Sequence, residues 1–293
     1  MQQNVLQLWA GEWPNPRASQ ALPTGEGVLD QGAFNAIEVD ELFDHVNHAS
    51  TLAGQTVLYR SLARPLADLD AIQAKQNAVK EIQDNPAVRE NIERILNTAA
   101  EEEGRLHLLL YGEFLGSLGT ARERHHIEGY GYKQYRRGVA FVNHLVGAIQ
   151  NSGVPQTPYL QGVYDKIRGF ADSNDYALMT GPVFNSEKGL QSKQEWSASM
   201  SPAMIFKPHL FKPMLLALVI ASVWVLSKFM SMDFFNLSRD GMSIGSVFMF
   251  PLLLAYIPVV GGYDRDHCII PLREIYKNSA DLAELLEGLG QLD

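Results

Sequence analysis

The chain lacks several features that secreted, redox-active and nucleotide-binding proteins need. Cys268 is its only cysteine, so no disulfide can form within the chain and a reducing compartment is expected. No glycine is followed directly by lysine, which excludes the Walker A loop that cradles phosphates. The first residues, MQQNVLQLWAGEWPNP, have neither a basic start nor an apolar core, so we expect no signal peptide.

Basic charge is also scarce. The 293 residues hold 24 Lys and Arg against 33 Asp and Glu, a net charge of −9. Nonspecific nucleic-acid binding is driven by neutralising phosphates, so this balance argues against it, although a local basic patch can still exist. Acidic residues also outnumber basic residues within 28–170, by 18 to 14.

Motifs for catalysis and metal binding are weak. Gly241 to Gly245 read GMSIG and match the G-x-S-x-G string of hydrolases, but that motif needs a preceding strand and a following soluble helix. His45 and His48 could share a metal with a neighbouring acid, yet such histidines are more often plain surface residues. His125 and His126 are expected on different sides of a helix. We therefore expect no enzyme activity, no catalytic residue, no cofactor and no metal ligand.

Two charge-free apolar runs stand near the C-terminus, MLLALVIASVWVLS at 214–227 and VFMFPLLLAYIPVV at 247–260. With their flanks they reach about 20 residues each, enough to cross a hydrocarbon layer about 30 Å thick. A short polar link, 233–241, joins them. The pattern predicts a two-helix transmembrane hairpin, and the lipid bilayer is then a partner. The alternative is a buried helical hairpin in a soluble protein, because charge-free cores of this length also occur there.

Loop charge gives the predicted hairpin an orientation. Five basic residues lie outside it (Lys207, Lys212, Arg265, Arg273 and Lys277) and two lie on the link side (Lys228 and Arg239). The positive-inside rule then places the chain in a bacterial-type inner membrane, multi-pass, with both termini cytoplasmic.

Helical periodicity dominates residues 38–170. Asn85 followed by Pro86 predicts a helix start, Asp68 is expected to cap the helix before it, and Thr157 followed by Pro158 predicts another start. No β alternation or nucleotide-type βαβ unit is evident. The sequence thus predicts an all-α protein in five parts: an irregular N-terminal arm at 1–27, a helical domain at 28–170, an irregular connecting segment at 171–212 that could hold short strands, the hairpin at 213–262, and a C-terminal amphipathic helix within 263–293.

Two groups of side chains are candidates for binding. Basic residues interleave with Tyr130, Tyr132 and Tyr135, a mixture that can bind phosphates and stack bases, contact anionic lipid headgroups, or form the solvated side of a helix. These basic residues are Arg122, Arg124, Lys133, Arg136 and Arg137. Trp9 and Trp13 could pack onto the body or dock a partner, since aromatic residues dominate binding hot spots.

Residues 29–96 resemble the helical core of the MutS family of mismatch-repair proteins. The matching positions are Asp40, Leu42, Phe43, Asn47, Thr51-x-x-Gly54, Leu58, Leu62, Pro65-Leu66, Asp68, Ile72, Gln76-x-Ala78-Val79 and Val88-Arg89. Lys75 stands where the family usually has arginine, and a weaker likeness extends towards Phe170. Neither the family's P-loop nor its Phe-x-Glu mismatch-reading wedge is present, so the resemblance implies a fold and assigns no activity.

These observations predict a membrane-anchored, non-catalytic, MutS-core-like scaffold or accessory subunit whose helical body faces the cytoplasm. Its partners would be other protein subunits, some of them membrane-embedded. The alternative is a DNA-binding mismatch-repair-type protein that works with a separate ATPase, and the basic residues between 122 and 137 would then be its contact surface.

Overall fold

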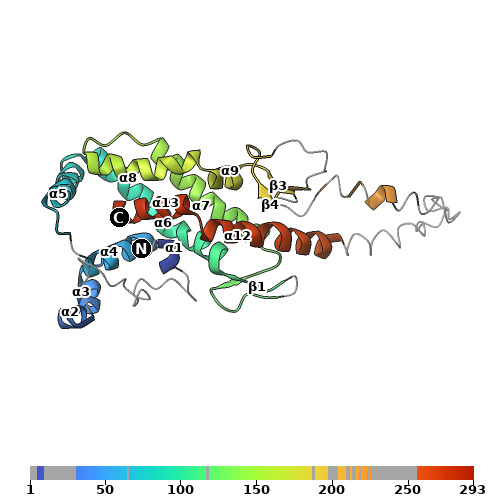
Figure 1. Cartoon of the computed structure of the whole chain (residues 1–293), viewed down its shortest axis with the longest axis horizontal. Helices are drawn as coiled ribbons and strands as arrows, with labels where there is room; N and C mark the ends of the chain where they lie inside the picture. Colours follow the sequence, from blue (N-terminus) through green and yellow to red (C-terminus); the bar gives the residue numbers. More distant parts are fainter. Residues whose placement is uncertain are drawn as a thin grey trace.

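The computed structural model is an elongated, mostly helical body (Figure 1). It describes residues 5–9, 31–64, 66–116, 119–186, 189–196, 204–208, 212, 216–217, 219–222, 225 and 256–293. The helices are α1 (Val5–Leu8), α2 (Gln31–Ala36), α3 (Val39–Val46), α4 (Leu52–Ala63), α5 (Leu69–Asp84), α6 (Pro86–Tyr111), α7 (Tyr132–Gln150), α8 (Pro158–Gly169), α9 (Asn174–Thr180), α12 (Ile270–Lys277) and α13 (Ala280–Leu292). The strands are β1 (Glu113–Phe114), β2 (His126–Ile127), β3 (Val183–Ser186), β4 (Gly189–Gln191) and β5 (Met204–Phe206).

Side-chain caps start the main helices where the sequence predicts. The Asn85 side chain accepts a hydrogen bond from Val88 N, and Pro86 is the first residue of α6. Asp68 caps α5 by accepting from Asp70 N. An N-terminal cap satisfies one of the backbone N–H groups that the first turn leaves without a partner. These local signals therefore fix where two long helices begin.

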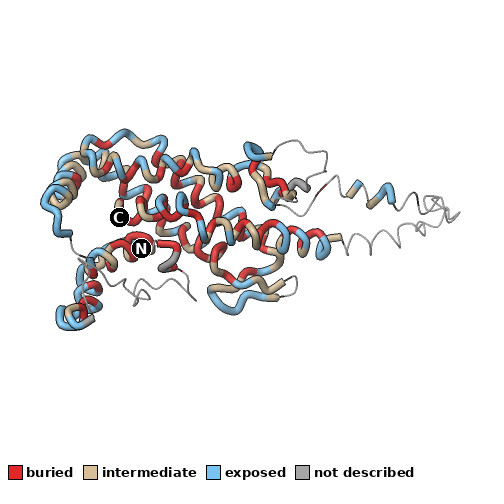
Figure 2. The backbone as a smooth tube through the Cα atoms, in the orientation of Figure 1, coloured by how far each residue is buried: buried red, intermediate tan, exposed pale blue. Residues whose placement is uncertain are grey.

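The main hydrophobic cluster of the core runs from Val5 to Leu292, and a smaller one joins α2, α3 and α4 through Phe34, Val39, Phe43, Tyr59 and Ala63. The C-terminal helix α13 lies inside the body between α4 and α8, and its inward residues are buried (Figure 2). Helices α6 and α7 are antiparallel neighbours that pack along their length. Because α1 and α13 belong to the same cluster, the core joins both ends of the described chain to the predicted helical domain.

The segment 171–212 contains more regular structure than an irregular connection. It holds α9 and an antiparallel sheet in which β3 lies between β4 and β5. A second, two-stranded parallel sheet pairs β1 with β2 in the connection between α6 and α7. The mostly helical prediction is confirmed, with these short strands added.

The prediction of a transmembrane hairpin over 213–262 is wrong for the helices that the structure describes: none of them is long and apolar enough to cross a membrane. Residues 256–264 are helical, but their helix continues without a break to Lys277. The charged residues Asp264, Arg265 and Asp266 follow directly after the apolar part of this helix that the structure describes. Most other residues of the predicted hairpin lie outside the described part. The multi-pass inner-membrane location depended on this hairpin and is contradicted with it.

The continuous helix 256–277 changes its winding at Arg265–Ile269, which forms a π-helical turn. Such turns insert into α-helices as local bulges. The residue just before the turn, Asp264, is buried and pairs with Lys212 and with the Tyr132 hydroxyl. The turn thus lies beside a buried polar contact between the C-terminal helix and α7.

The C-terminal segment forms two helices where the sequence predicts one amphipathic helix within 263–293. The chain breaks between α12 and α13, and Ser279 caps α13 by accepting from Leu282 N at 2.9 Å. In α5 the buried residue is Ala78, whereas the neighbouring Val79 is 53% exposed.

Candidate functional site

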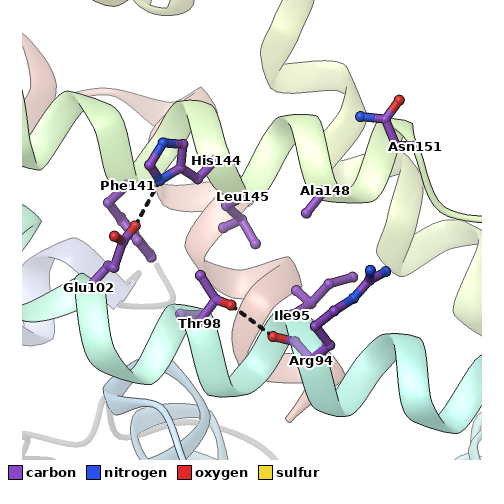
Figure 3. A pocket seen from close by; sticks show the side chains of 10 residues that line it. Arg94, Ile95, Thr98, Glu102, Phe141, His144, Leu145, Ala148 and Asn151 are labelled. Atoms are coloured by element: carbon purple, nitrogen blue, oxygen red, sulfur yellow. Dashed lines mark hydrogen bonds and ion pairs between the residues drawn. The ribbon is translucent and has the colours of Figure 1, made fainter.

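A groove between α6 and α7 is a concave surface of the body (Figure 3). Its volume is about 310 Å³. Its lining comes from α6 (Arg94, Ile95, Thr98, Ala99 and Glu102) and from α7 with the residue after it (Phe141, His144, Leu145, Ala148 and Asn151). Apolar side chains form its floor and polar side chains its rim, which is the usual composition of a site that takes an apolar group.

The polar rim has one well-defined contact. His144 Nδ1 lies 2.9 Å from Glu102 Oε2, and Arg105 Nη1 lies 2.8 Å from Glu102 Oε1. Figure 3 shows the first of these contacts closing one end of the groove. The Thr98 hydroxyl donates to the Arg94 carbonyl at 3.0 Å, so it is engaged by its own helix. The groove thus combines the contact between Glu102 and His144 at its rim with an apolar floor.

An acidic strip of α6 continues from the groove. A second hollow, of about 360 Å³, shares Arg94 and Thr98 with the groove and is otherwise lined by Glu90, Glu93, Asn97 and Glu101. The three glutamates are exposed. A ligand that fills the groove would therefore meet negative charge beside its apolar anchor.

The basic side chains between residues 122 and 137 face solvent, whereas the tyrosines among them face the body. Lys133, Arg136 and Arg137 lie at i, i+3 and i+4 on the exposed face of α7. Arg122 and Arg124 are exposed in the connection before β2. Among the described residues, none of these five side chains makes an ion pair, so their charge is directed to solvent.

The tyrosines point into the body. The Tyr132 hydroxyl donates to Asp264, and the Tyr135 hydroxyl lies 3.2 Å from that of Tyr276. Tyr130 packs so closely on the helix 256–264 that a methyl group added at Gly261 would meet its ring at 2.4 Å. The predicted mixture of basic and stacking side chains is therefore a basic surface with its aromatic rings turned away.

The two tryptophans have different outcomes. Trp9 is 1% exposed and belongs to the core cluster, with its Nε1 donating to Thr56 Oγ1 at 3.4 Å. It packs onto the body, so it offers no surface for docking. Trp13 lies outside the described residues, as does the GMSIG motif at 241–245.

Two ionisable groups of α6 with strongly shifted pKa values, Glu103 and His107, are not among the site residues predicted from the sequence. Glu103 lies in a run of three glutamates, yet it is 5% exposed, and both its oxygens accept from the first backbone N–H groups of α4, at Leu52 and Ala53. Burial raises the pKa of Glu103 to about 7, although these two hydrogen bonds oppose the rise. The signal was present, because Ala99, Glu103, Leu106 and Leu110 repeat at the helical period and all are buried.

His107 lies one turn after Glu103 and shares its buried face. Burial lowers the pKa of His107 to about 4, partly opposed by its contact with the Trp9 carbonyl at 3.3 Å. Neither Glu103 nor His107 lines the groove. Their perturbed pKa values follow from packing between α1, α4 and α6.

Cys268 and its neighbours form a further buried polar cluster. Burial, with the nearby negative Asp264, raises the pKa of the Cys268 thiol to about 12. The pKa of Tyr132 is also raised, mainly by burial and further by its hydrogen bond to Asp264. At neutral pH both groups keep their protons, which is the state of structural side chains and not of activated nucleophiles.

The two histidine pairs have different outcomes. His45 and His48 are both exposed, and His45 Nδ1 lies 2.8 Å from the Glu41 carbonyl of its own helix. The prediction that His125 and His126 lie on a helix is wrong: His126 is the first residue of β2 and His125 precedes it, with ring centroids 4.5 Å apart.

Comparison with known proteins gives one result. Residues 28–114 match the family model of MutS domain III. The match contains the residues 29–96 whose resemblance is visible in the sequence, and it runs through α6 into β1. No curated protein and no solved structure matches the chain. Residues 28–114 are therefore a MutS-like, mismatch-repair-related helical region, and α6, which carries one wall of the groove, belongs to it.

Proposed function

We propose that this chain, which carries a MutS domain III-like region at 28–114, is a non-catalytic scaffold that binds a partner protein through the groove between α6 and α7. The observation that carries the proposal is the combination of an apolar floor with an acidic strip on α6. An aliphatic or aromatic anchor of the partner would fill the floor, and its flanking lysines or arginines would meet the three exposed glutamates. Such anchors in desolvated pockets supply most of the energy of protein interfaces.

The absence of enzyme activity is part of the proposal. In the described residues, the ionisable groups with large pKa changes are buried in contacts between helices and do not face the groove. The groove itself presents Glu102 and His144 paired with each other. Among the described residues, His144 is hydrogen-bonded to Glu102 and to no serine, threonine or cysteine, so the groove shows no nucleophile activated by this histidine.

The test fills the groove without disturbing the core. Ala148 lines the groove and is only partly buried, so Ala148→Trp places a large side chain in its floor. The matched control is Ala87→Trp, at an exposed position of α6 outside the groove. Proteins that co-purify with the wild-type chain and with Ala87→Trp should be lost with Ala148→Trp. For a purified partner, the affinity should fall at least about tenfold, as expected for a lost anchor.

Two results would reject the scaffold proposal. One is an unchanged set of bound proteins in Ala148→Trp. The other is a partner that both tryptophan variants lose equally, because that would report a general surface effect. Circular dichroism of all three proteins shows whether each is folded.

DNA binding is a second candidate function, and the five unpaired basic side chains favour it. Because the neighbouring tyrosines point inward, this surface would contact phosphates without stacking on bases. The double variant Arg136→Ala with Arg137→Ala should weaken duplex binding and reduce the slope of log K against log salt by about one per lost phosphate contact. Arg89→Ala, which removes an arginine already paired with Glu93, is the control. No binding of the wild type at low salt would rule out this candidate.

A further inference from the structure

The connection between α6 and α7 brings together three side chains of the metal-binding type. One ring nitrogen of His125, one of His126 and a carboxylate oxygen of Glu113 all lie within 4.8 Å of one another. Glu113 is exposed, and both histidines are partly buried. This cluster lies at the opposite end of α6 from Asn85 and is separate from the groove.

Backbone structure, and not chance contact of long side chains, holds the three residues together. In the parallel pair of β1 and β2, Glu113 stands opposite His126. Glu113 N donates to the His125 carbonyl at 2.8 Å, and Leu115 N donates to the Ile127 carbonyl at 3.0 Å. The ligand positions on the two strands are therefore fixed by main-chain hydrogen bonds.

Both imidazoles are supported in ways that suit a ligand. His125 Nε2 lies 3.4 Å from Glu123 Oε2, which reproduces the carboxylate–histidine contact found behind many metal-bound histidines. His126 Nδ1 accepts from the backbone N–H groups of Arg122 and Glu123 at 3.4 and 3.3 Å. These two contacts hold the His126 ring in place.

From this geometry we infer that Glu113, His125 and His126 form a binding site for a divalent transition-metal ion of the zinc class. Two imidazole nitrogens and one carboxylate oxygen are a donor set that suits zinc, whereas magnesium and calcium prefer oxygen ligands alone. Three protein ligands leave the fourth tetrahedral position open to water or to a group of a partner. This assignment replaces the expectation of no metal ligand and does not depend on the proposed scaffold function.

The bound ion would join β1 to β2 across the intervening residues 115–124. Arg122 and Arg124 lie on this connection, so the ion would also fix part of the basic surface next to α7. Since the ion binds the folded arrangement and not the unfolded chain, it would raise the thermal midpoint of unfolding.

Titration of the metal-stripped, untagged protein with zinc chloride tests the inference. Calorimetry should show one ion per chain, and zinc should raise the unfolding midpoint whereas magnesium should not. Glu113→Gln and His125→Ala should each weaken zinc binding at least about tenfold, since even indirect ligand contacts contribute that much. His126→Asn should do the same while retaining a side-chain acceptor for the two backbone N–H groups.

The control replaces the other close histidine pair, His45→Ala with His48→Ala, whose rings are not gathered with an acid in the described structure. It should bind zinc as the wild type does. Cobalt(II) in place of zinc should give a visible spectrum that disappears in the three ligand variants only. Equal zinc affinity in wild type, Glu113→Gln and His125→Ala would mean an adventitious ion and would overturn the inference, as would no binding by the wild type.

Discussion

Glutamate and histidine occur in opposite settings on the two sides of helix α6. On the groove side, Glu102 is paired with His144 of α7, whose side chain is 60% exposed. On the inner side, Glu103 and His107 are buried against α4 and α1 and bond to backbone groups. Burial alone separates the two roles. The exposed ring of His144 is available to a ligand, whereas Glu103 and His107 have displaced pKa values and hold helices together.

The largest expected effect tests whether the inner side carries the stability. Trp9→Ala removes a fully buried indole between α1, α4 and α6, and should lower the free energy of unfolding by about 3–5 kcal/mol. His144→Ala on the groove side should change it by about 0.5 kcal/mol or less. Urea unfolding of both variants measures the contrast. Similar losses in the two would show that the groove side is also part of the stabilising core.

The next effect concerns pH. The folded-state pKa of Glu103 is raised from 4.5 to about 7, so its contribution to stability is lost as pH rises through that range. The folded-state pKa of His107 is lowered from 6.5 to about 4, so its contribution is lost as pH falls through that range. Between about pH 4.5 and 6.5 these two slopes oppose each other.

Single substitutions should reveal each slope. Compared with the wild type, Glu103→Gln should become more sensitive to acid, and His107→Gln should lose stability as pH rises towards 7. Each change should amount to at most about 3 kcal/mol across the range, given the size of the pKa shifts. Unfolding midpoints between pH 4 and 8 measure it. Parallel pH profiles in all three proteins would show that the two groups titrate alike in the folded and unfolded chain.

Two glycines of α7 provide a smaller test of the same contrast. A methyl group at Gly138 would meet Leu109 Cδ2 of α6 at 2.8 Å, whereas one at Gly147 would meet nothing within 4 Å. Gly138→Ala should therefore destabilise by about 1–2 kcal/mol through crowding. Gly147→Ala should stabilise by up to about 1 kcal/mol through its helix propensity. Thermal unfolding compares them, and a stabilised Gly138→Ala would mean that α6 and α7 can separate freely.

The smallest effect is that of the exposed pair itself. A double-mutant cycle with Glu102→Gln and His144→Gln should give a coupling energy of about 0.2–1 kcal/mol, because water screens the pair. Chemical denaturation of the four proteins provides the value. A coupling well above this range would contradict the solvent-exposed character of the groove rim.

Much of the helical framework was readable from the sequence, because its signals are local. Asn85 with Pro86 and Asp68 mark helix starts that the structure reproduces. The likeness to the MutS core at 29–96 lies within the matched region 28–114. These predictions needed only neighbouring residues, which is why they succeeded.

The features that were not predicted correctly depend on residues that are far apart in the sequence. The apolar runs at 214–227 and 247–260 predicted a membrane hairpin, but no helix in the described part of the chain is long and apolar enough to cross a membrane. The helical period places Glu103 on the buried face of α6, but its partners, the first N–H groups of α4, lie some 50 residues earlier in the chain. The groove depends on two helices separated by the β1–β2 connection, and the meeting of Glu113 with His125 and His126 depends on the pairing of two very short strands.

The π-helical turn at Arg265–Ile269 has a consequence for how the chain tolerates length changes. A wider turn absorbs more residues than an α-helical one, and each residue advances an α-helix by about 100° around its axis. Deleting one residue within this turn would let it wind as an α-helix and keep the flanking segments close to their present phase, whereas a deletion within α12 would swing Asp264 away from Lys212 and Tyr132. The pairing partner of that carboxylate is thus specified by a count of residues as much as by their chemistry.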